Sequence, residues 1–132
     1  MILSTEGMKP IYVQIAEWLE TEILSGNIGA DEKIYSQYQL ADMFNINPAT
    51  AAKGLNILAD DDILYKKRGL GMFVLPNARE IILVKRKNQI LKYLVLELVM
   101  EADRLGVEED ELIEMIKNAK LQHGGEETDE SN

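Results

Sequence analysis

The residues of this chain best suited to chemistry are cations beside glycines, and they indicate phosphate binding rather than catalysis. Lys66, Lys67 and Arg68 directly precede Gly69 and lie close to Gly71. Lysine and arginine pair with phosphate oxygens, and glycine lets a backbone approach a phosphate or the floor of a nucleic-acid groove. The alternative is an ordinary solvated hairpin turn, because a Gly-x-Gly pair taken alone is a weak signal.

Groups that could support catalysis or bind a metal are scarce. The sequence has no cysteine and a single histidine, His123, which we expect to be solvated. The three aspartates at 60–62 are expected to form a solvated turn, because no second ligand cluster follows them at a recognisable spacing. No pair of carboxylates and no serine beside a base suggests turnover. We therefore expect neither an enzyme nor a bound cofactor or metal.

Composition sets further limits on the class of protein. A length of 132 residues with 46% hydrophobic residues indicates one small folded domain, with or without an appendage. The net charge of −9 argues against a protein that coats nucleic acid by bulk electrostatics, although a local basic patch remains compatible with it. The lack of cysteine suits the cytoplasm, and we expect no signal peptide, membrane span or membrane partner.

The basic cluster follows a pattern of two short helices. Ser36 is a suitable N-cap for the first helix, whose apolar residues between Leu40 and Phe44 recur at helical spacing. Asn47 caps the second helix, which begins at Pro48, where the missing N–H costs nothing. Two helices joined by a short turn, with small or polar residues outside the second, are typical of a helix-turn-helix. Its second helix, the recognition helix, enters the major groove of DNA.

Other elements support this helix pair. Residues 63–66 and 72–75 are predicted to pair as a β-hairpin, or wing, with the basic cluster at its tip. Pro10 opens an earlier helix with an apolar stripe at four-residue steps, and Gly26 ends it. Gly54 lies inside the recognition helix at an intrinsic cost, which suggests close packing against another helix.

A long helical pattern follows the hairpin, so the predicted fold is mainly α with a small β-hairpin wing. Residues 79–105 are predicted to be helical, although the apolar run at 81–84 is also compatible with a strand. Gly106 ends this helix, and a second one follows at 108–121. We predict a winged helix-turn-helix domain at 1–75, a two-helix dimerisation region at 76–123, and a disordered acidic tail at 124–132.

The predicted long helix carries more large apolar side chains than two helices can bury between them. We interpret the excess as a dimer surface, which would hold two recognition helices about 34–36 Å apart, one turn of DNA. The residues expected at this surface are Leu91, Leu94, Val95, Leu98, Val99 and Leu105.

A second basic region accompanies the start of the long helix. Its members are Arg79, Lys85, Arg86, Lys87 and Lys92. These cations either flank the DNA or form an exposed face of the helix, and we favour the exposed face.

Taken together, the motifs resemble the winged-helix domain of GntR-family bacterial transcriptional regulators. The matching segments, in the family's order and spacing, are residues 9–15, Gly26, 36–41, 47–50 and 68–74. The C-terminal part is similar to the two-helix appendage of the YtrA subfamily, at residues 85–87 and 101–113. The resemblance implies a homodimeric regulator, usually a repressor, that binds a palindromic operator in double-stranded DNA.

The resemblance also implies which residues contact DNA. They are Ser36, Tyr38, Asn47, Ala49, Thr50, Arg68, Gly69 and Gly71. We add Lys53, because it is the only cation on the predicted recognition helix. The family usually has an arginine where Tyr38 stands and often another where Pro48 stands. This chain therefore lacks two side chains that could fork onto guanine.

The sequence leaves two questions open: whether the winged helix recognises DNA, and where a small-molecule effector would bind. A winged helix can serve as a protein-interaction module without DNA recognition, which the acidic body and the missing arginines would suit. The helices after the wing are too few to enclose a typical small-molecule pocket within one subunit. A small-molecule effector would therefore bind at a crevice of the dimer.

Overall fold

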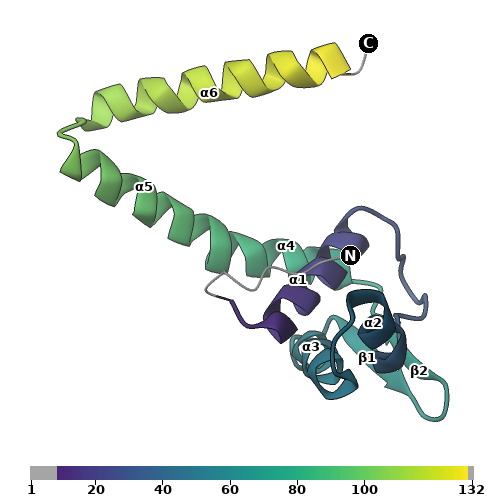
Figure 1. Cartoon of the computed structure of the whole chain (residues 1–132). Coiled ribbons are helices and arrows are strands. Elements are labelled where there is room, and N and C mark those ends of the chain that lie inside the picture. The colour runs from purple at the N-terminus through teal and green to yellow at the C-terminus, as the bar shows by residue number, and fades with distance from the viewer. Residues whose placement is uncertain (1–8, 131–132) are drawn as a thin grey trace. The chain divides into compact units, whose positions relative to one another are not determined.

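The structure, a computed structural model, describes residues 9–130, and its side chains are described through residue 124. It divides into two units, one ending at Arg86 and one beginning at Lys87, and each is described by itself. The elements of the first unit are α1 (Ile11–Leu24), α2 (Gln37–Phe44), α3 (Pro48–Asp60), β1 (Leu64–Lys67), β2 (Gly71–Val74) and α4 (Ala78–Arg86) (Figure 1). Those of the second are the π-helical turn η1 (Lys87–Leu91), α5 (Lys92–Arg104) and α6 (Glu109–Glu130).

The core of the first unit forms where α1 and α2 pack on α3. Ile15 and Leu19 of α1 are fully buried together with Leu58 of α3. A Cβ placed on Gly54 would lie 3.0 Å from Ile15 Cγ2 and 3.0 Å from the Tyr12 carbonyl oxygen. This confirms the close helix packing that the glycine predicted, because only a residue without a side chain lets α1 and α3 approach so nearly.

The caps of the helix-turn-helix are those that the sequence predicts. Ser36 Oγ accepts a hydrogen bond from the Gln39 N–H at 3.1 Å, and Gln39 Oε1 accepts one from the Ser36 N–H at 2.8 Å. This reciprocal pair is a capping box. Asn45 ends α2 in the left-handed conformation, with φ 55°, and Asn47 caps α3. The turn geometry is therefore encoded locally.

The wing carries a third strand-like segment, which comes from the stretch before α2. β1 and β2 are antiparallel, with Lys67 opposite Gly71. On the outer side of β2, Lys33 forms a β-bridge with Phe73, and the Ile34 N–H donates to the Met72 carbonyl at 2.9 Å. Ile34 is buried. The segment before α2 thereby fixes the wing to the helix-turn-helix.

Helix α4 belongs to the first unit, which differs from the predicted domain boundary after residue 75. Ala78 and Ile82 are buried in the same core as α1 and β2, so the boundary falls after Arg86 instead. The apolar run at 81–84, which was also compatible with a strand, is helical. Burial of one face of α4 therefore explains both its helical conformation and its place in the first unit.

Three cations of the second basic region bind groups of the first unit; Arg79 stays exposed, as expected, whereas Lys85 and Arg86 are half-buried and serve neither of the two expected roles. Arg79 donates to the Leu24 carbonyl. Lys85 Nζ lies 2.7 Å from Glu20 Oε2 and 2.6 Å from Asp61 Oδ2, and Arg86 donates to the Glu17 carbonyl at 2.7 Å. These contacts fasten α4 to α1 and α3. Its remaining members, Lys87 and Lys92, are exposed.

Glu20 explains why Lys85 and Arg86 turn inward. Its side chain is 2% exposed and would be a costly buried charge without partners. Burial lowers the pKa of Lys85, but hydrogen bonds from its ammonium group to Asp61 and Glu20 outweigh burial and leave the pKa above its ordinary value. The sequence gives no sign of this cluster, because its members lie far apart along the chain.

The second unit begins with η1, which continues directly into α5. Gly106 follows α5 with φ 71°, and the Val107 N–H donates to the Ala102 carbonyl at 2.8 Å, as in a Schellman motif. Gly106 therefore ends the helix as predicted. No helix among the described residues is long and apolar enough to cross a membrane.

Helix α6 is longer than the predicted helix at 108–121. It continues to Glu130, so residues 124–130 of the predicted disordered tail are helical, while 131–132 lie outside the described residues. The physical reason is that extending an existing helix adds one hydrogen bond for each residue ordered, which is far easier than starting one.

Candidate nucleic-acid interface

The start of α3 presents small side chains around a rigid cap. Asn47 Oδ1 accepts a hydrogen bond from the Ala49 N–H at 2.8 Å, and Pro48 occupies the first helical position. Ala49 is exposed and Thr50 is half-buried. A helix start without bulky side chains can approach the edges of base pairs closely, and the methyl groups of alanine and threonine suit the thymine methyl.

Further along α3, two polar side chains continue the exposed face. Lys53 is exposed, and its Nζ lies 5.7 Å from the ring centroid of Tyr12, within cation–π range. Asn56, which no sequence motif selects, is exposed one turn later. Its amide can pair with adenine. The three-residue step from Lys53 along a predicted helix is the signal that could have identified it.

At the start of α2, Ser36 has a structural role, whereas Tyr38 is exposed. Ser36 uses its hydroxyl oxygen to cap the helix, so its first role is to fix the start of α2. Tyr38, in the first turn of the same helix, is 69% exposed. An exposed aromatic ring with a hydroxyl is available to a partner, whereas Ser36 contributes mainly by position.

The tip of the hairpin is a short turn that requires its glycines. The Leu70 N–H donates to the Lys67 carbonyl at 2.9 Å, so Arg68 and Gly69 lie at the turn. Gly69 has φ 79° and Gly71 has φ 110°, conformations that residues with side chains rarely adopt. Arg68 is exposed at this turn. The local backbone therefore places one guanidinium at the end of a narrow protrusion.

The other two wing cations lie on opposite faces of β1, because successive strand residues alternate. Lys67 Nζ lies 4.4 Å from the ring centroid of Phe73 and 5.8 Å from that of Tyr65. Lys66 lines a groove on the other face. The three cations of the basic cluster therefore have different surroundings. Arg68 lies at the tip of the hairpin, Lys67 lies over the rings of Phe73 and Tyr65, and Lys66 lines the groove.

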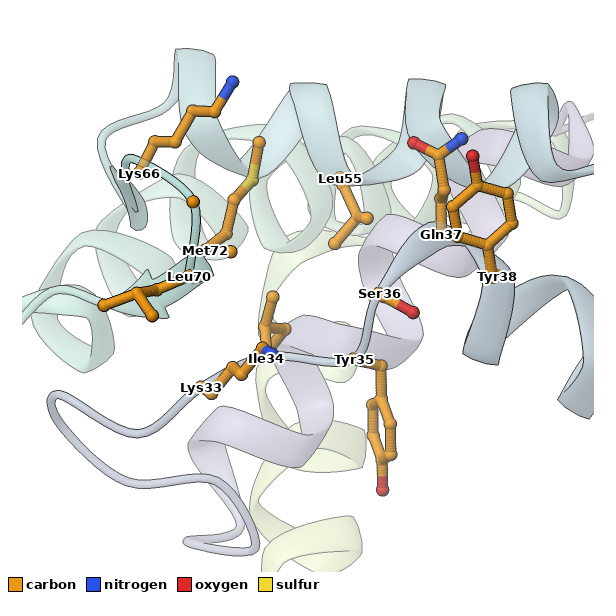
Figure 2. A pocket seen from close by; sticks show the side chains of 12 residues that line it. Lys33, Ile34, Tyr35, Ser36, Gln37, Tyr38, Leu55, Lys66, Leu70 and Met72 are labelled. Carbon is orange, nitrogen blue, oxygen red and sulfur yellow. The ribbon is translucent and has the colours of Figure 1, made fainter.

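That groove, of about 400 Å³, brings together several of the residues selected from the sequence. In Figure 2 the hairpin forms one side with Lys66, Leu70 and Met72, while Gln37 and Tyr38 come from the start of α2 opposite. Leu55 of α3 and Ile34 lie between these sides. The predicted residues lining it are Ser36, Tyr38, Gly69 and Gly71. Asn47, Ala49, Thr50, Lys53 and Arg68 do not line it.

The six residues predicted to form the dimer surface all belong to the second unit. Their side chains, Leu91, Leu94, Val95, Leu98, Val99 and Leu105, are between 41% and 71% exposed. Tyr93, Leu96 and Met100 of α5 are exposed as well. Helix α5 is thus apolar on more than one side, which is unusual for a helix that faces water.

No metal site accompanies these surfaces in the described part of the chain. No group of three or more histidine, cysteine, aspartate or glutamate side chains there is arranged to hold an ion. Asp62, in the acidic run, has φ 61° and takes the left-handed position that often ends a helix. The run therefore has a structural use.

Family models and curated sequences identify proteins similar to this chain. Residues 11–74 match the model described as "Bacterial regulatory proteins, gntR family". The HTH-type transcriptional repressor YtrA of Bacillus subtilis is 31% identical over 121 residues, which is 91% of this chain and 92% of that protein. The similarity to YtrA therefore includes the helices after the wing.

Solved structures give the same result. A GntR family transcriptional regulator from Listeria monocytogenes superposes with a TM-score of 0.68 at 31% identity, covering 86% of this chain and 97% of that one. The AraR DNA-binding domain in complex with operator ORX1 superposes with a TM-score of 0.53 at 29% identity, covering 56% of this chain and 94% of that one. The second structure shows this kind of domain on DNA.

Proposed function

Because the chain belongs to the gntR family of bacterial regulatory proteins, we propose that it is a repressor that binds a palindromic operator as a homodimer in the cytoplasm. It is a DNA-binding transcriptional regulator, as its relatives are. Its similarity to a repressor along nearly that protein's whole length supports repression. The alternative of a protein-interaction module without DNA recognition loses its basis, since the relatives are regulators that act on DNA.

The observation that carries the proposal is the capped, small-residue start of α3 in the same unit as a narrow cationic hairpin tip. We assign base contacts to Ala49 and Thr50, supported by Lys53 and Asn56 further along the helix. We assign contacts in the adjacent minor groove to Arg68 and the glycine turn. A recognition helix and a wing commonly divide DNA readout in this way.

Dimerisation is the second part of the proposal, and α5 supports it. Six large apolar side chains that are at least 41% exposed form a surface that a lone subunit would hold in water at considerable cost. A second copy of the chain would cover it and would present two recognition helices to two half-sites of an operator. Any small-molecule effector would then occupy a crevice between the copies.

The test is to select duplexes from a random library with the full chain and to measure the affinity of the selected sequence by fluorescence anisotropy. Arg68→Ala and Thr50→Ala should each weaken binding about tenfold, because a good base contact contributes about 1–3 kcal/mol. Lys87→Ala, an exposed change outside the proposed interface, should leave affinity unchanged. Selection of no sequence, or equal affinity of all variants, would contradict the proposal.

A further inference from the structure

We propose that Leu70, at the tip of the hairpin, is a specificity-determining residue whose apolar side chain enters the minor groove and selects A·T pairs over G·C pairs. This proposal rests on the proposed function, which assigns the hairpin tip to that groove. The sequence motifs select Arg68, Gly69 and Gly71 at this tip and pass over the leucine between the two glycines. Leu70 would therefore add base readout to a turn that otherwise provides charge and backbone.

Leu70 is a large apolar residue that the core of the first unit does not use. Its side chain is 61% exposed. Met72, two residues later on the same hairpin, packs against the buried core, whereas Leu70 is absent from the described residues that do so. Leu70 instead lies at the hairpin edge of the groove, across from Tyr38 (Figure 2). Exposed leucines are common on protein surfaces, so the role of Leu70 depends on its position at the tip.

The turn isolates the Leu70 side chain at the end of a narrow protrusion. The residues on both sides of it, Gly69 and Gly71, have no side chains, and a Cβ at Gly69 would meet no atom within 4 Å. The Leu70 N–H donates to the Lys67 carbonyl at 2.9 Å, which fixes the leucine on the turn. The minor groove of B-DNA is about 6 Å wide. A tip with one projecting aliphatic side chain suits a groove of that width.

The charges near Leu70 favour contact with DNA. Residues 63–75 include three cations and no aspartate or glutamate, although the whole chain has a net charge of −9. Arg68 is exposed at the same turn. A guanidinium is attracted to a narrow minor groove, whose negative potential is enhanced in runs of A·T pairs. Arg68 would therefore draw the tip, and Leu70 with it, into the kind of groove that the leucine selects.

Guanine has one group in the minor groove that an apolar side chain disfavours. Both kinds of base pair present acceptors there, but only G·C pairs add a donor, the 2-amino group of guanine. A leucine against this amino group would exclude water from a donor without accepting its hydrogen bond, which costs free energy. Minor-groove proteins frequently place apolar side chains, leucine among them, against base steps. Contact with Leu70 should therefore favour pairs that lack the amino group, which are A·T pairs.

The experiment changes the amino group and keeps the rest of the base pair. Anisotropy titrations with the full chain compare four forms of the library-selected duplex, changed symmetrically in both half-sites and scanned one position at a time. The pairs are A·T, G·C, inosine·cytosine, which is G·C without the 2-amino group, and 2,6-diaminopurine·T, which is A·T with it. Major-groove readout follows the major-groove edge of the purine, whereas the proposed contact follows the amino group.

For the wild type we expect a position in each half-site where the two pairs that carry the amino group bind about tenfold more weakly than the two pairs that lack it. Leu70→Ala should bind all four duplexes with similar affinity. Leu70→Asn should do the same, because its amide oxygen can accept a hydrogen bond from the amino group. Leu83→Ala, which shortens an exposed leucine of α4, should keep the wild-type preference. In the described part of the chain the non-glycine residues with positive φ are Asp31, Asn45 and Asp62, so changes at position 70 introduce no backbone strain.

Arg68→Ala separates the leucine from the guanidinium beside it. This variant should bind all four duplexes more weakly by the same factor and leave their order unchanged. If Arg68→Ala instead abolishes the preference while Leu70→Ala keeps it, the guanidinium reads the width of the groove, and the role of Leu70 is wrong.

Failure of this inference can be distinguished from failure of the proposed function. If the wild type prefers the selected duplex to a mixed-sequence duplex but no position responds to the amino group, Leu70 does not read the minor groove, and the proposed function stands. The same conclusion holds if Leu70→Ala keeps the full wild-type preference. If the wild type selects no duplex, the proposed function fails and this inference fails with it.

Discussion

At the scale of single residues, the buried carboxylate of Glu20 determines how the first unit is closed. Its oxygens lie 2.7 Å from Lys85 Nζ and 3.5 Å from Arg86 Nε. The structure thus uses two cations of α4 to neutralise one charge on α1. Charges placed this way contribute to the docking of α4 and are not available for DNA.

Lys85→Ala should destabilise the first unit by about 2–4 kcal/mol, because it leaves Asp61 without its cation and Glu20 with Arg86 alone. Urea unfolding followed by circular dichroism measures the decrease in stability. Lys87→Ala removes the same side chain from an exposed position two residues later and should change stability by less than about 0.5 kcal/mol. Equal stability of the two variants would show that the cluster does not hold α4.

At the scale of elements, the segment before α2 and the wing act together. The Tyr65 hydroxyl on β1 donates to Asp31 Oδ1 at 2.9 Å. Two residues after Asp31, the Lys33 bridge adds backbone pairing on the other strand. A two-stranded hairpin is marginal by itself, so these contacts to a third segment help to give the wing a defined position.

The Tyr65–Asp31 contact predicts an effect at alkaline pH. The hydrogen bond to Asp31 raises the pKa of Tyr65, with burial and the negative charge of Asp31 acting in the same direction. Because the folded pKa lies above the unfolded one, the contact stabilises fully below the ordinary tyrosine pKa of about 10, and this stabilisation disappears as pH rises through the raised value.

Absorbance titration of tyrosinate measures this effect, with Tyr65→Phe identifying the transition of Tyr65 by difference. Asp31→Asn keeps an acceptor and a residue type that tolerates the left-handed backbone of position 31, where φ is 63°. We expect this variant to lower the pKa of Tyr65, since the negative charge is removed. An unchanged transition would show that the contact does not persist in solution.

At the scale of the whole molecule, the chain carries two surfaces of different chemistry, and we propose a different partner for each. The first unit presents cations and small residues, whereas the second presents the apolar face of α5. The proposed operator with two half-sites would need both surfaces, because pairing two subunits combines two weak contacts into one strong one.

Leu98→Glu should therefore convert a dimer to a monomer and weaken operator binding by at least about tenfold, since a charge would have to be buried in the proposed dimer surface. Sedimentation velocity reports the mass, and anisotropy reports the affinity. Glu97→Lys alters an exposed charge one position earlier on α5 and should leave the mass unchanged. A Leu98→Glu dimer with wild-type affinity would remove α5 from the interface.

The sequence by itself determined the helix-turn-helix, the N-cap at Ser36, the start of the second helix at Asn47 and Pro48, and the wing. It also determined the relationship to the gntR family. The caps, helices and hairpin depend on neighbours within a few residues, and local propensity and hydrophobic spacing specify them. The family relationship rests instead on the resemblance of the motifs.

Only the tertiary structure decided that α4 packs against the first unit through Glu20 and Lys85, that Lys33 joins the wing, and that Lys66 lies in a groove without carboxylates. These pairings join segments that are far apart in the chain. Which of several charges meet across such distances depends on how the helices pack, and no local pattern records it.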